Sequence, residues 1–592
     1  MRRTRLPFLA LCLVVAALPL LPVPPLWIIH MNFIGLSAIT CLGLVLLTGV
    51  AGLTSFGQAA FVGLGAYATA YCSTALGLSP WLGLVVALAL TVSVALLLAA
   101  VTLRMSGHYL PLATLAWALA LYYLMSNLDF LGKYDGILDI PALSIAGWKV
   151  TGARGYYGVI WIAALASAAA TVRLLDSRTG RAIRSLSGGT AMAEAMGIST
   201  YRYKVLTFVL AAMLAGLSGW LFAHFQRTVN PSPFSATKGI EYLFMTVLGG
   251  VGSVWGAFTG AAVVRLLEDQ LQVLLPRLLG NNGNFELILF GIVLVAVLKY
   301  APQGLWSYVL RLARRWWPEQ PRVHDWHDAR ALDVRSKPAA GEKLLEVQGL
   351  SKRFGGLLAV NDVSFIVNAG EIVALIGPNG AGKSTTFNLI SGVAVPTSGS
   401  VVFRGDAVGG LPSREVARRG MSRTFQHVKM LPGMTVLENV ALGGHVRSRK
   451  GALRAMLRLD RDEERQLFRE AACQLERVGL GQLMDTLAGN LSLGQARLLE
   501  IARALCADPL LLLLDEPAAG LRHKEKEALA ACLAQLKQEG MSILLVEHDM
   551  DFVMSLAERI VVMEFGNKLI EGSPEEIQAS PVVRAAYLGT EH

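Results

Sequence analysis

Residues 371–392 read EIVALIGPNGAGKSTTFNLISG, and this stretch decides the fold of the C-terminal half of the chain. The apolar run Ile372–Ile376 suits a short buried strand, and it leads directly into a glycine-rich turn. Glycines let backbone N–H groups wrap a phosphate because no Cβ blocks the approach. The N-terminus of the helix predicted after the turn adds positive potential. The order of strand, loop and helix therefore predicts an α/β P-loop NTPase domain that binds a nucleotide.

Two side chains of this loop have predicted roles of their own. Lys383 is expected to reach the β- and γ-phosphates of ATP, and Ser384 is expected to ligate Mg²⁺. The residues predicted to bind the nucleotide here are Gly377, Pro378, Asn379, Gly380, Ala381, Gly382, Lys383, Ser384 and Thr385.

A second apolar run, Leu510–Leu514, ends in paired acids and suits a buried strand whose tip meets the metal. Asp515 is predicted to hold Mg²⁺ through water, and Glu516 is the candidate general base for the attacking water. An apolar run that ends in Asp-Glu is weak evidence alone. Because it follows a P-loop, it supports an ATP-hydrolysing site.

Three shorter pieces complete the predicted site. They are Gln426 in SRTFQ, the helix start LSLGQ at Leu491–Gln495, and His548 after the apolar run in LLVEHD. Each is ambiguous alone, since a single glutamine is usually a surface residue and a single histidine is more often structural than catalytic.

The N-terminal half has a different composition. Hydrophobic residues make up 54% of the chain and charged residues 16%, against about 25% charged in a typical soluble domain. The deficit is confined to the region before about Tyr300, while the sequence from Leu344 onward has ordinary soluble composition. We therefore predict a membrane domain over residues 1–317, a linker over 318–343 and an ATP-binding domain over 344–592.

Long apolar blocks predict the membrane spans. A span needs about 20 mostly apolar residues. Such blocks begin near Leu6, Phe33, Phe56, Trp81, His108, Gly158, Lys204, Tyr242 and Phe285. Both termini are expected inside, which requires an even number of crossings, and GGVGS at 249–253 is a candidate break that divides one block into two. The fold prediction is a polytopic all-α membrane domain with about eight to ten transmembrane helices, ten being favoured.

The net charge of +10 is partly explained by arginine clusters that flank apolar segments, as the positive-inside rule predicts. Because no basic stripe interleaved with aromatic residues occurs, a nucleic-acid partner is not expected. The longest basic stretch between spans, 173–204, is predicted to be cytoplasmic. Within it, TAMAEAMGIS at 190–199 is a short helix candidate that ends at Gly197. It is either a handle for a motor domain or an ordinary solvated loop.

Together the C-terminal motifs resemble those of the ABC transporter ATPase family over nearly all of Leu344–His592. The resemblance implies that Phe354 stacks on adenine, that Gln426 senses Mg²⁺ and contacts the permease, and that His548 is the switch histidine. It also places Ser492, Gly494 and Gln495 of LSLGQ near the γ-phosphate of a nucleotide held by another ATPase. Leu493 replaces a glycine of the family pattern, and Arg522 stands where Asn or Asp is usual. A second ATPase domain is therefore expected as a partner.

More narrowly, the C-terminal half resembles the G-type ATP-binding subunit of high-affinity branched-chain amino acid importers, in SKRFGGLLAVNDVSF, LSLGQARLLEIARAL, DEPAAGL and PVVRAAYLG. The membrane half is similar to their M-type permease, in LTSFGQAAFVGLGAYATA, SRTGRAIRSL, AEAMGIS and APQGLW. This implies an ATP-driven importer of branched-chain or related hydrophobic amino acids in a bacterial inner membrane, with the ATP-binding domain cytoplasmic. The implied partners are an H-type permease, an F-type ATPase, a periplasmic binding protein and membrane lipid.

The resemblance also implies that the helix near 190–199 is the coupling element and docks in the groove around Gln426. The usual TGG-type motif is replaced by LGKYDGILDIP, which leaves the substrate open. Urea and short amides are alternative cargoes. An ABC exporter half-transporter is a further alternative. Exporters have roughly six long spans that extend into the cytoplasm, whereas this chain has short loops and more predicted spans.

Overall fold

The computed structural model describes Cys12, Val15, Pro19 and residues 21–103, 109–145, 147–279, 285–301, 303–316 and 325–588. For residues 272–279, 285–290, 294, 298 and 314–316 it describes the backbone only. The chain divides into two compact units. The helical unit comprises Met1–Asp176, Tyr201–Pro321 and Ala455–Arg458, and the sheet unit comprises Ser177–Thr200, Arg322–Arg454 and Leu459–His592.

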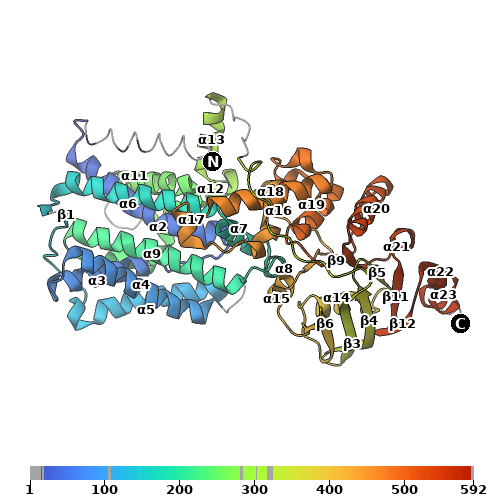
Figure 1. The fold of residues 1–592 in the computed structure, drawn as a ribbon. Coiled ribbons are helices and arrows are strands. Elements are labelled where there is room, and N and C mark those ends of the chain that lie inside the picture. The colour runs from blue at the N-terminus through green and yellow to red at the C-terminus, as the bar shows by residue number, and fades with distance from the viewer. Residues whose placement is uncertain are drawn as a thin grey trace. The chain divides into compact units, whose positions relative to one another are not determined.

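The helical unit is built from long apolar helices (Figure 1). Their bounds are α2 Pro25–Leu44 with a π-helical turn at Val45–Val50, α3 Gln58–Thr74, α4 Pro80–Thr102, α5 Tyr109–Asn127, α6 Gly152–Leu175, α9 Thr200–Gln226, α10 Ala236–Gly249, α11 Val254–Leu279, α12 Phe285–Tyr300 and α13 Leu305–Trp316. Between α5 and α6 lies a small antiparallel ribbon of β1 Ser144–Ile145 and β2 Trp148–Lys149.

Five of the described helices are long and apolar enough to cross a membrane, or six if the bent pair α10–α11 counts as one span. This supports a membrane domain, while the exact number of crossings stays a prediction. The predicted span near Leu6 lies outside the described residues. In the span Pro25–Val50, 83% of the most apolar 18-residue window is buried, whereas only 28% of the corresponding window is buried in α4 and in α5. The first of these spans is therefore central, and α4 and α5 are the peripheral helices that lipid can contact.

The predicted break at GGVGS is confirmed. Helices α10 and α11 meet at 118° across residues 250–253. Gly250 has a φ of +125°, a conformation that glycine adopts without a Cβ clash. The two arms approach so closely that a Cβ on Gly260 would lie 1.8 Å from the carbonyl oxygen of Met245.

Helices α3 and α9 pack closely through small residues. A Cβ on Gly65 would lie 2.3 Å from the Gly216 carbonyl oxygen, and a Cβ on Gly219 would lie 2.0 Å from that of Val62. Small residues at these positions let the two helix backbones approach closely.

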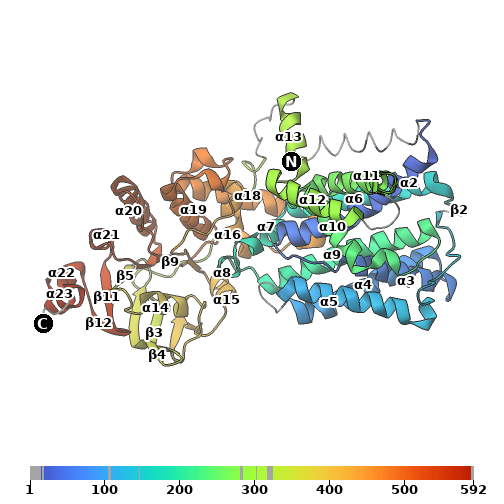
Figure 2. The same ribbon diagram turned by 180° about the vertical axis from the view of Figure 1, so that it is seen from behind.

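The sheet unit contains two sheets (Figure 2). A six-stranded sheet has the order β12-β11-β5-β10-β9-β8, and a four-stranded antiparallel sheet has the order β4-β3-β6-β7. The strands are β3 Lys343–Phe354, β4 Leu357–Asn368, β5 Ile372–Ile376, β6 Ser398–Phe403, β7 Asp406–Ala407, β8 Met421–Arg423, β9 Leu511–Asp515, β10 Ser542–Val546, β11 Arg559–Glu564 and β12 Asn567–Gly572. Strands β5, β9 and β10 are parallel and buried throughout, which explains their continuous apolar sequences.

The helices of the sheet unit are short and mostly capped. They are α7 Arg178–Ser185, α8 Thr190–Ala195, α14 Lys383–Ile390, α15 Ser413–Arg418, α16 Val436–Gly443, α18 Arg461–Arg477, α19 Leu493–Leu505, α20 His523–Gln538, α21 Met550–Leu556, α22 Pro574–Ala579 and α23 Pro581–Leu588. Helix α17, Ala452–Met456, lies where the chain passes between the two units.

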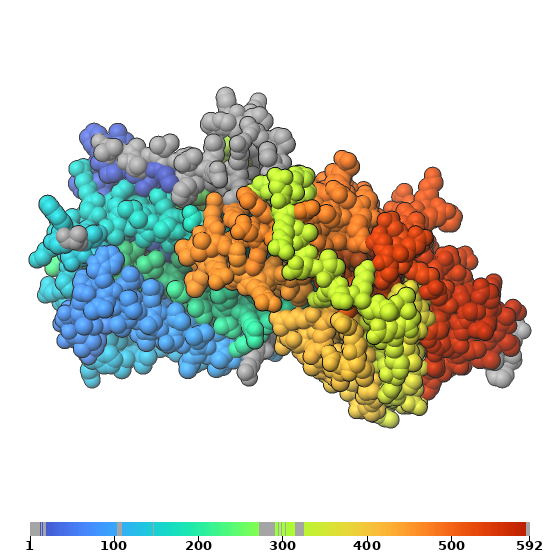
Figure 3. All heavy atoms as spheres, viewed as in Figure 1, coloured from blue at the N-terminus to red at the C-terminus, as the bar shows by residue number. Residues whose placement is uncertain are grey.

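Residues 325–342, which we call the strap, run along the surface of the sheet unit before β3 begins (Figure 3). Trp326 is buried in the hydrophobic core of this unit. The Arg335 backbone N–H donates to Asp508 Oδ2 at 2.6 Å, and Lys337 Nζ donates to the Glu539 carbonyl at 2.7 Å. The strap is therefore held by the sheet unit at several points rather than lying free.

Candidate functional site

The glycine-rich loop lies where the sequence places it, between the buried strand β5 and α14. Gly377, Gly380 and Gly382 have φ values of +148°, +84° and +94°. A Cβ on Gly377 would lie 2.1 Å from the Met563 carbonyl oxygen, so a larger residue would displace the loop. Asn379, Gly380 and Ser384 are exposed, while Pro378, Gly382 and Thr385 are half-buried and Ala381 is buried. Part of the loop is thus accessible to a ligand, as phosphate binding requires.

Lys383 folds over the loop that precedes it. Its Nζ donates to the carbonyl oxygens of Gly377 and Pro378 at 2.7 and 2.9 Å. Burial lowers the pKa of Lys383 below its usual value, and the negative charge of Glu516 partly opposes this shift. Phosphate oxygens are better partners for a buried ammonium than neutral carbonyls. Lys383 is therefore expected to exchange these carbonyl partners for the phosphate oxygens of a nucleotide.

Asp515 ends β9 as a buried carboxylate with one occupied and one free oxygen. Its Oδ2 lies 3.5 Å from Arg423 Nη2 at the end of β8, whereas its Oδ1 is buried without a hydrogen-bond partner. Burial raises the pKa of Asp515, and Arg423 opposes that shift. An unpartnered buried carboxylate oxygen next to a P-loop fits the ligand that Mg²⁺ prefers.

Glu516, Gln426 and His548 converge on one point. Gln426 Nε2 donates to Glu516 Oε2 at 3.0 Å, and His548 Nε2 lies 2.6 Å from Glu516 Oε1. Glu516 has a φ of +47°, a left-handed conformation rare outside glycine. Its backbone N–H donates to the Val546 carbonyl at 2.9 Å, which holds this strained residue against β10. Three residues from separate segments of the sequence are therefore in contact through the carboxylate of Glu516.

The LSLGQ segment begins α19 through a capping box. Ser492 Oγ accepts a hydrogen bond from the Gln495 backbone N–H at 3.4 Å, and Gln495 Oε1 accepts one from Ser492 N–H at 3.0 Å. Gly494 lies against Glu525, since a Cβ there would be 2.6 Å from Glu525 Oε1. Among the described residues, no hydrogen bond or ion pair joins 492–495 to the glycine-rich loop. The LSLGQ group and the glycine-rich loop are thus not directly joined in the described part of the chain.

The remaining predicted positions lie at the edges of the fold. Phe354 is 51% exposed at the end of β3, with Lys352 Nζ 5.0 Å from its ring centroid. Arg522 caps α20, and its backbone N–H donates to Glu525 Oε2 at 2.9 Å. Phe354 therefore offers an aromatic face to a ligand, whereas Arg522 is used locally.

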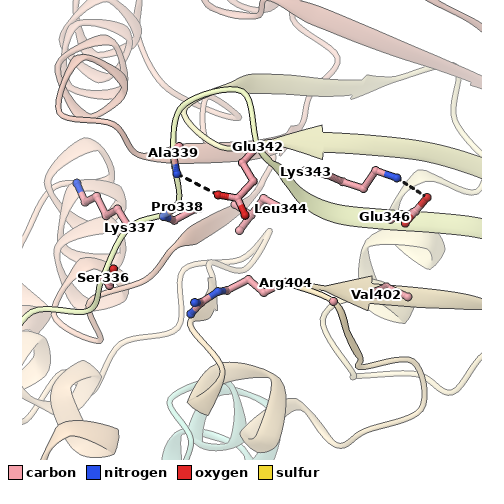
Figure 4. A pocket seen from close by; sticks show the side chains of 11 residues that line it. Ser336, Lys337, Pro338, Ala339, Glu342, Lys343, Leu344, Glu346, Val402 and Arg404 are labelled. Atoms are coloured by element: carbon pink, nitrogen blue, oxygen red, sulfur yellow. Dashed lines mark hydrogen bonds and ion pairs between the residues drawn. The ribbon is translucent and has the colours of Figure 1, made fainter.

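A hollow with a volume of about 630 Å³ lies elsewhere, between the end of the strap and the β6–β7 turn. It is lined by Lys337, Glu342, Lys343, Glu346 and Arg404 among others (Figure 4). None of the predicted nucleotide-binding residues lines it.

Residues 177–200, which we call the docking segment, are folded into the sheet unit. Arg181 Nη1 forms a 2.8 Å ion pair with Glu464 Oε2 of α18, and both side chains are buried. Arg178 donates hydrogen bonds to the carbonyl oxygens of His445, Ser448 and Lys450. Burial lowers the pKa of His445 far below its usual value, and the arginines around it lower it further.

The second half of the docking segment, α8, lies against α15 and α19. Glu194 Oε2 is 3.6 Å from Arg414 Nη1, and Arg503 Nη1 is 3.7 Å from Met192 Sδ. The expected short helix is present, and it is followed by Gly197 with a φ of +74°. No hydrogen bond or ion pair in the described part of the chain joins Gln426 to this helix. The segment contacts α15, α18 and α19, and Gly188 lies so close to Leu431, which follows the loop of Gln426, that a Cβ there would be 2.9 Å from Leu431 Cδ2.

Sequence reasoning missed several charged residues of this region. The sequence did not point to Arg423, which pairs with Asp515, or to Glu464, which pairs with Arg181. It also did not point to the buried charges of α19. The available signal was a charge inside an otherwise apolar helix face, as in LLEIARAL. Sequence alone does not tell which distant loop such a charge holds.

Comparisons with known proteins agree for both halves. Residues 28–298 match the family described as "Branched-chain amino acid transport system / permease component", residues 360–519 match "ABC transporter", and residues 568–592 match "Branched-chain amino acid ATP-binding cassette transporter". The C-terminal half is 45% identical over 251 residues to the high-affinity branched-chain amino acid transport ATP-binding protein LivG of Escherichia coli K12, covering 42% of this chain and 98% of that protein. The chain belongs to the branched-chain amino acid ABC transporter family.

Two further relatives are similar to the same half of this transporter. The corresponding BraF protein of Pseudomonas aeruginosa is 45% identical over 249 residues, covering 42% of this chain and 98% of BraF. A crystal structure of a nucleotide-free ATP-binding cassette from an ABC transporter is 33% identical, with a TM-score of 0.38, and covers 42% of this chain and 99% of the cassette. The protein is thus a permease fused to an ATPase whose hydrolysis of ATP is coupled to transport.

Proposed function

We propose that this transporter imports branched-chain or related hydrophobic amino acids across a bacterial inner membrane, with its ATP-binding half on the cytoplasmic side. The observation that carries the proposal is that the permease family and the ATP-binding relatives, matched independently, name the same transport system. In this proposal, residues 1–317 are the permease, 318–343 connect the two halves, and 344–592 are the ATP-binding domain.

ATP hydrolysis is assigned to the Glu516 group. The carboxylate of Glu516 takes a proton from the attacking water as general base. Gln426 and His548 hold its two oxygens at 3.0 and 2.6 Å, which orients the lone pair that accepts the proton. Lys383 and the amides of the glycine-rich loop bind the β- and γ-phosphates.

Mg²⁺ fits the residues around this group. Asp515 Oδ1 is buried and unpartnered, and Ser384 is exposed at the start of α14. These two and Gln426 are the proposed ligands, Asp515 through a water. A bound Mg²⁺ neutralises charge on the phosphate oxygens.

The separation of LSLGQ from the phosphate loop supports a shared site. The loop of this chain would face the LSLGQ-type segment of a second, F-type ATPase, and Ser492, Gly494 and Gln495 would face the γ-phosphate held by that partner. An H-type permease and a periplasmic binding protein would complete the complex. The docking segment would carry the motion of the ATPases to the permease as its coupling element.

The test is uptake by vesicles containing the assembled transporter. ATP-dependent uptake of leucine is expected, with isoleucine and valine competing and with urea or acetamide neither transported nor competing. Uptake of urea or acetamide in preference to leucine would assign the transporter to the amide class. ATP-driven release of cargo from the cytoplasmic to the opposite face would support the exporter alternative and overturn import.

A further inference from the structure

Three charged side chains lie on one face of α19, behind the LSLGQ segment. Arg497, Glu500 and Arg503 follow at spacings of three, and they are 6%, 2% and 0% exposed. Glu500 Oε1 is 3.2 Å from Arg503 Nη2, and Glu500 Oε2 is 3.8 Å from Arg497 Nη1. We call these residues the α19 triad.

A buried group of this kind calls for a functional explanation. Removing charges from water is costly, and well-packed apolar residues in their place are often as stable or more stable. The α19 triad also leaves buried polar atoms without hydrogen-bond partners, namely Arg497 Nε, Glu500 Oε2 and Arg503 Nε. Stability alone therefore does not account for the triad.

One end of the α19 triad holds the backbone of the loop that carries Gln426. Arg497 donates to the carbonyl oxygens of Phe425 and Gln426 at 2.8 and 2.6 Å. Glu500 Oε1 accepts a 2.9 Å hydrogen bond from the Lys429 backbone N–H. Because the side chain of Gln426 donates to Glu516, the place of this loop decides how the proposed general base is oriented.

The other end touches the docking segment. Met192 of α8 is buried, with its sulfur on Arg503. Helix α16 covers the same arginine so closely that a Cβ on Gly443 would lie 1.8 Å from the Arg503 carbonyl oxygen. Arg503 is thus enclosed, and the packing of Met192 limits where its guanidinium can lie.

We propose that the α19 triad is a positioning element, which places Gln426 against Glu516 when Met192 of the docking segment is seated on Arg503. This rests on the assignment of hydrolysis to Glu516. Ser492 of the LSLGQ segment is the N-cap of α19. Movement of this one helix therefore links the docking segment both to the LSLGQ segment and to the loop of Gln426. The arginines act through the loop and do not touch the reacting atoms.

The first test is hydrogen exchange in the full-length protein in lipid nanodiscs, with the variant Met192→Ala. Met192 makes no described hydrogen bond to residues 424–430, yet truncating it is expected to speed amide exchange there about 5- to 30-fold, the range of typical coupling between linked sites. Met541→Ala is the matched control, because Met541 is similarly buried in the core of the same unit but lies off the triad. Equal exchange at 424–430 in both variants would overturn the proposal.

The second test is a double-mutant cycle with Glu500→Gln, which keeps an acceptor for Lys429 N–H but removes the charge between the arginines. In this background Met192→Ala should no longer change amide exchange at 424–430, since the α19 triad is already disrupted. Effects of the two substitutions on this exchange that add independently would refute the proposed positioning role of the triad. If Glu500→Gln does not fold, the comparison of amide exchange at 424–430 in Met192→Ala and Met541→Ala still tests the proposal. Neither measurement needs a transported substrate, so a failure of leucine uptake in the unmodified protein would overturn the proposed cargo and leave this result standing.

Discussion

The buried ion pair between Arg181 and Glu464 allows the attachment of the docking segment to be tested quantitatively. The two side chains are 3% and 7% exposed and 2.8 Å apart, and the Arg181 guanidinium also lies 4.9 Å from the centroid of the Phe468 ring. In Arg181→Ala, Glu464 stays buried without its cation. Breaking a buried pair in this way costs roughly 3–5 kcal/mol, so even the lower figure shifts the docking equilibrium about 100-fold.

The assay is amide exchange of residues 179–185 in the full-length protein. Because exchange of these amides requires the segment to detach, Arg181→Ala should speed it about 100-fold. The rescue variant Arg181→Met with Glu464→Gln replaces both charges with neutral groups of similar size, and it should restore most of the protection because no unpaired charge remains buried. Exchange within about threefold of the unmodified protein in Arg181→Ala, or no recovery in the rescue variant, would refute the view that this pair holds the segment.

Four further predictions concern separate parts of the molecule. Glu516→Gln should lower ATP hydrolysis by about 100- to 10,000-fold and abolish uptake while nucleotide binding persists, and unchanged uptake would remove the role assigned to Glu516. Trp326→Ala should destabilise the sheet unit by about 3–5 kcal/mol, seen as loss of exchange protection in its core strands; a loss confined to residues 325–342 would mean that the strap is not part of that core. The pKa of His445 is lowered by burial and by neighbouring arginines, so below about pH 6.5 the unfolded chain binds a proton that the folded chain does not bind. The free energy of unfolding should therefore fall by up to about 1.4 kcal/mol per pH unit as the pH drops. His445→Gln should flatten that slope, and an identical slope in the variant would contradict the lowered pKa of His445. Gly219→Val should prevent the contact of α9 with Val62 and leave little folded permease on size-exclusion chromatography, whereas Gly219→Ser, with its smaller side chain, should retain more.

The strands and turns that carry the candidate nucleotide site were predictable because their signals are local. The glycine-rich loop follows β5 and precedes α14 directly, and paired acids end β9, so periodicity and spacing identify both. The short helix before Gly197 and the break between α10 and α11 were predictable for the same reason, since glycines mark both positions. Each of these signals lies within a few residues of the feature that it predicts.

Other features depend on contacts between distant parts of the chain. The contacts of Gln426 and His548 with Glu516 join three segments, and only the parallel order of β9 and β10 brings two of them together. Residues 318–343 are predicted to be a linker from their charged, Trp- and Pro-containing sequence, and within them Trp326 packs into the core of the sheet unit. Whether an irregular segment packs or stays free depends on a surface formed elsewhere in the sequence.

By itself, the sequence determined that this protein joins apolar spans to a P-loop ATPase, because hydrophobic length and glycine spacing are properties of short stretches. The tertiary structure decided which partners the charges have. Arg181 lies on Glu464, and Arg497 and Glu500 hold the loop of Gln426. The physical reason is that a buried charge must find an opposite charge or a hydrogen-bond partner nearby in space, and that partner can lie anywhere in the chain.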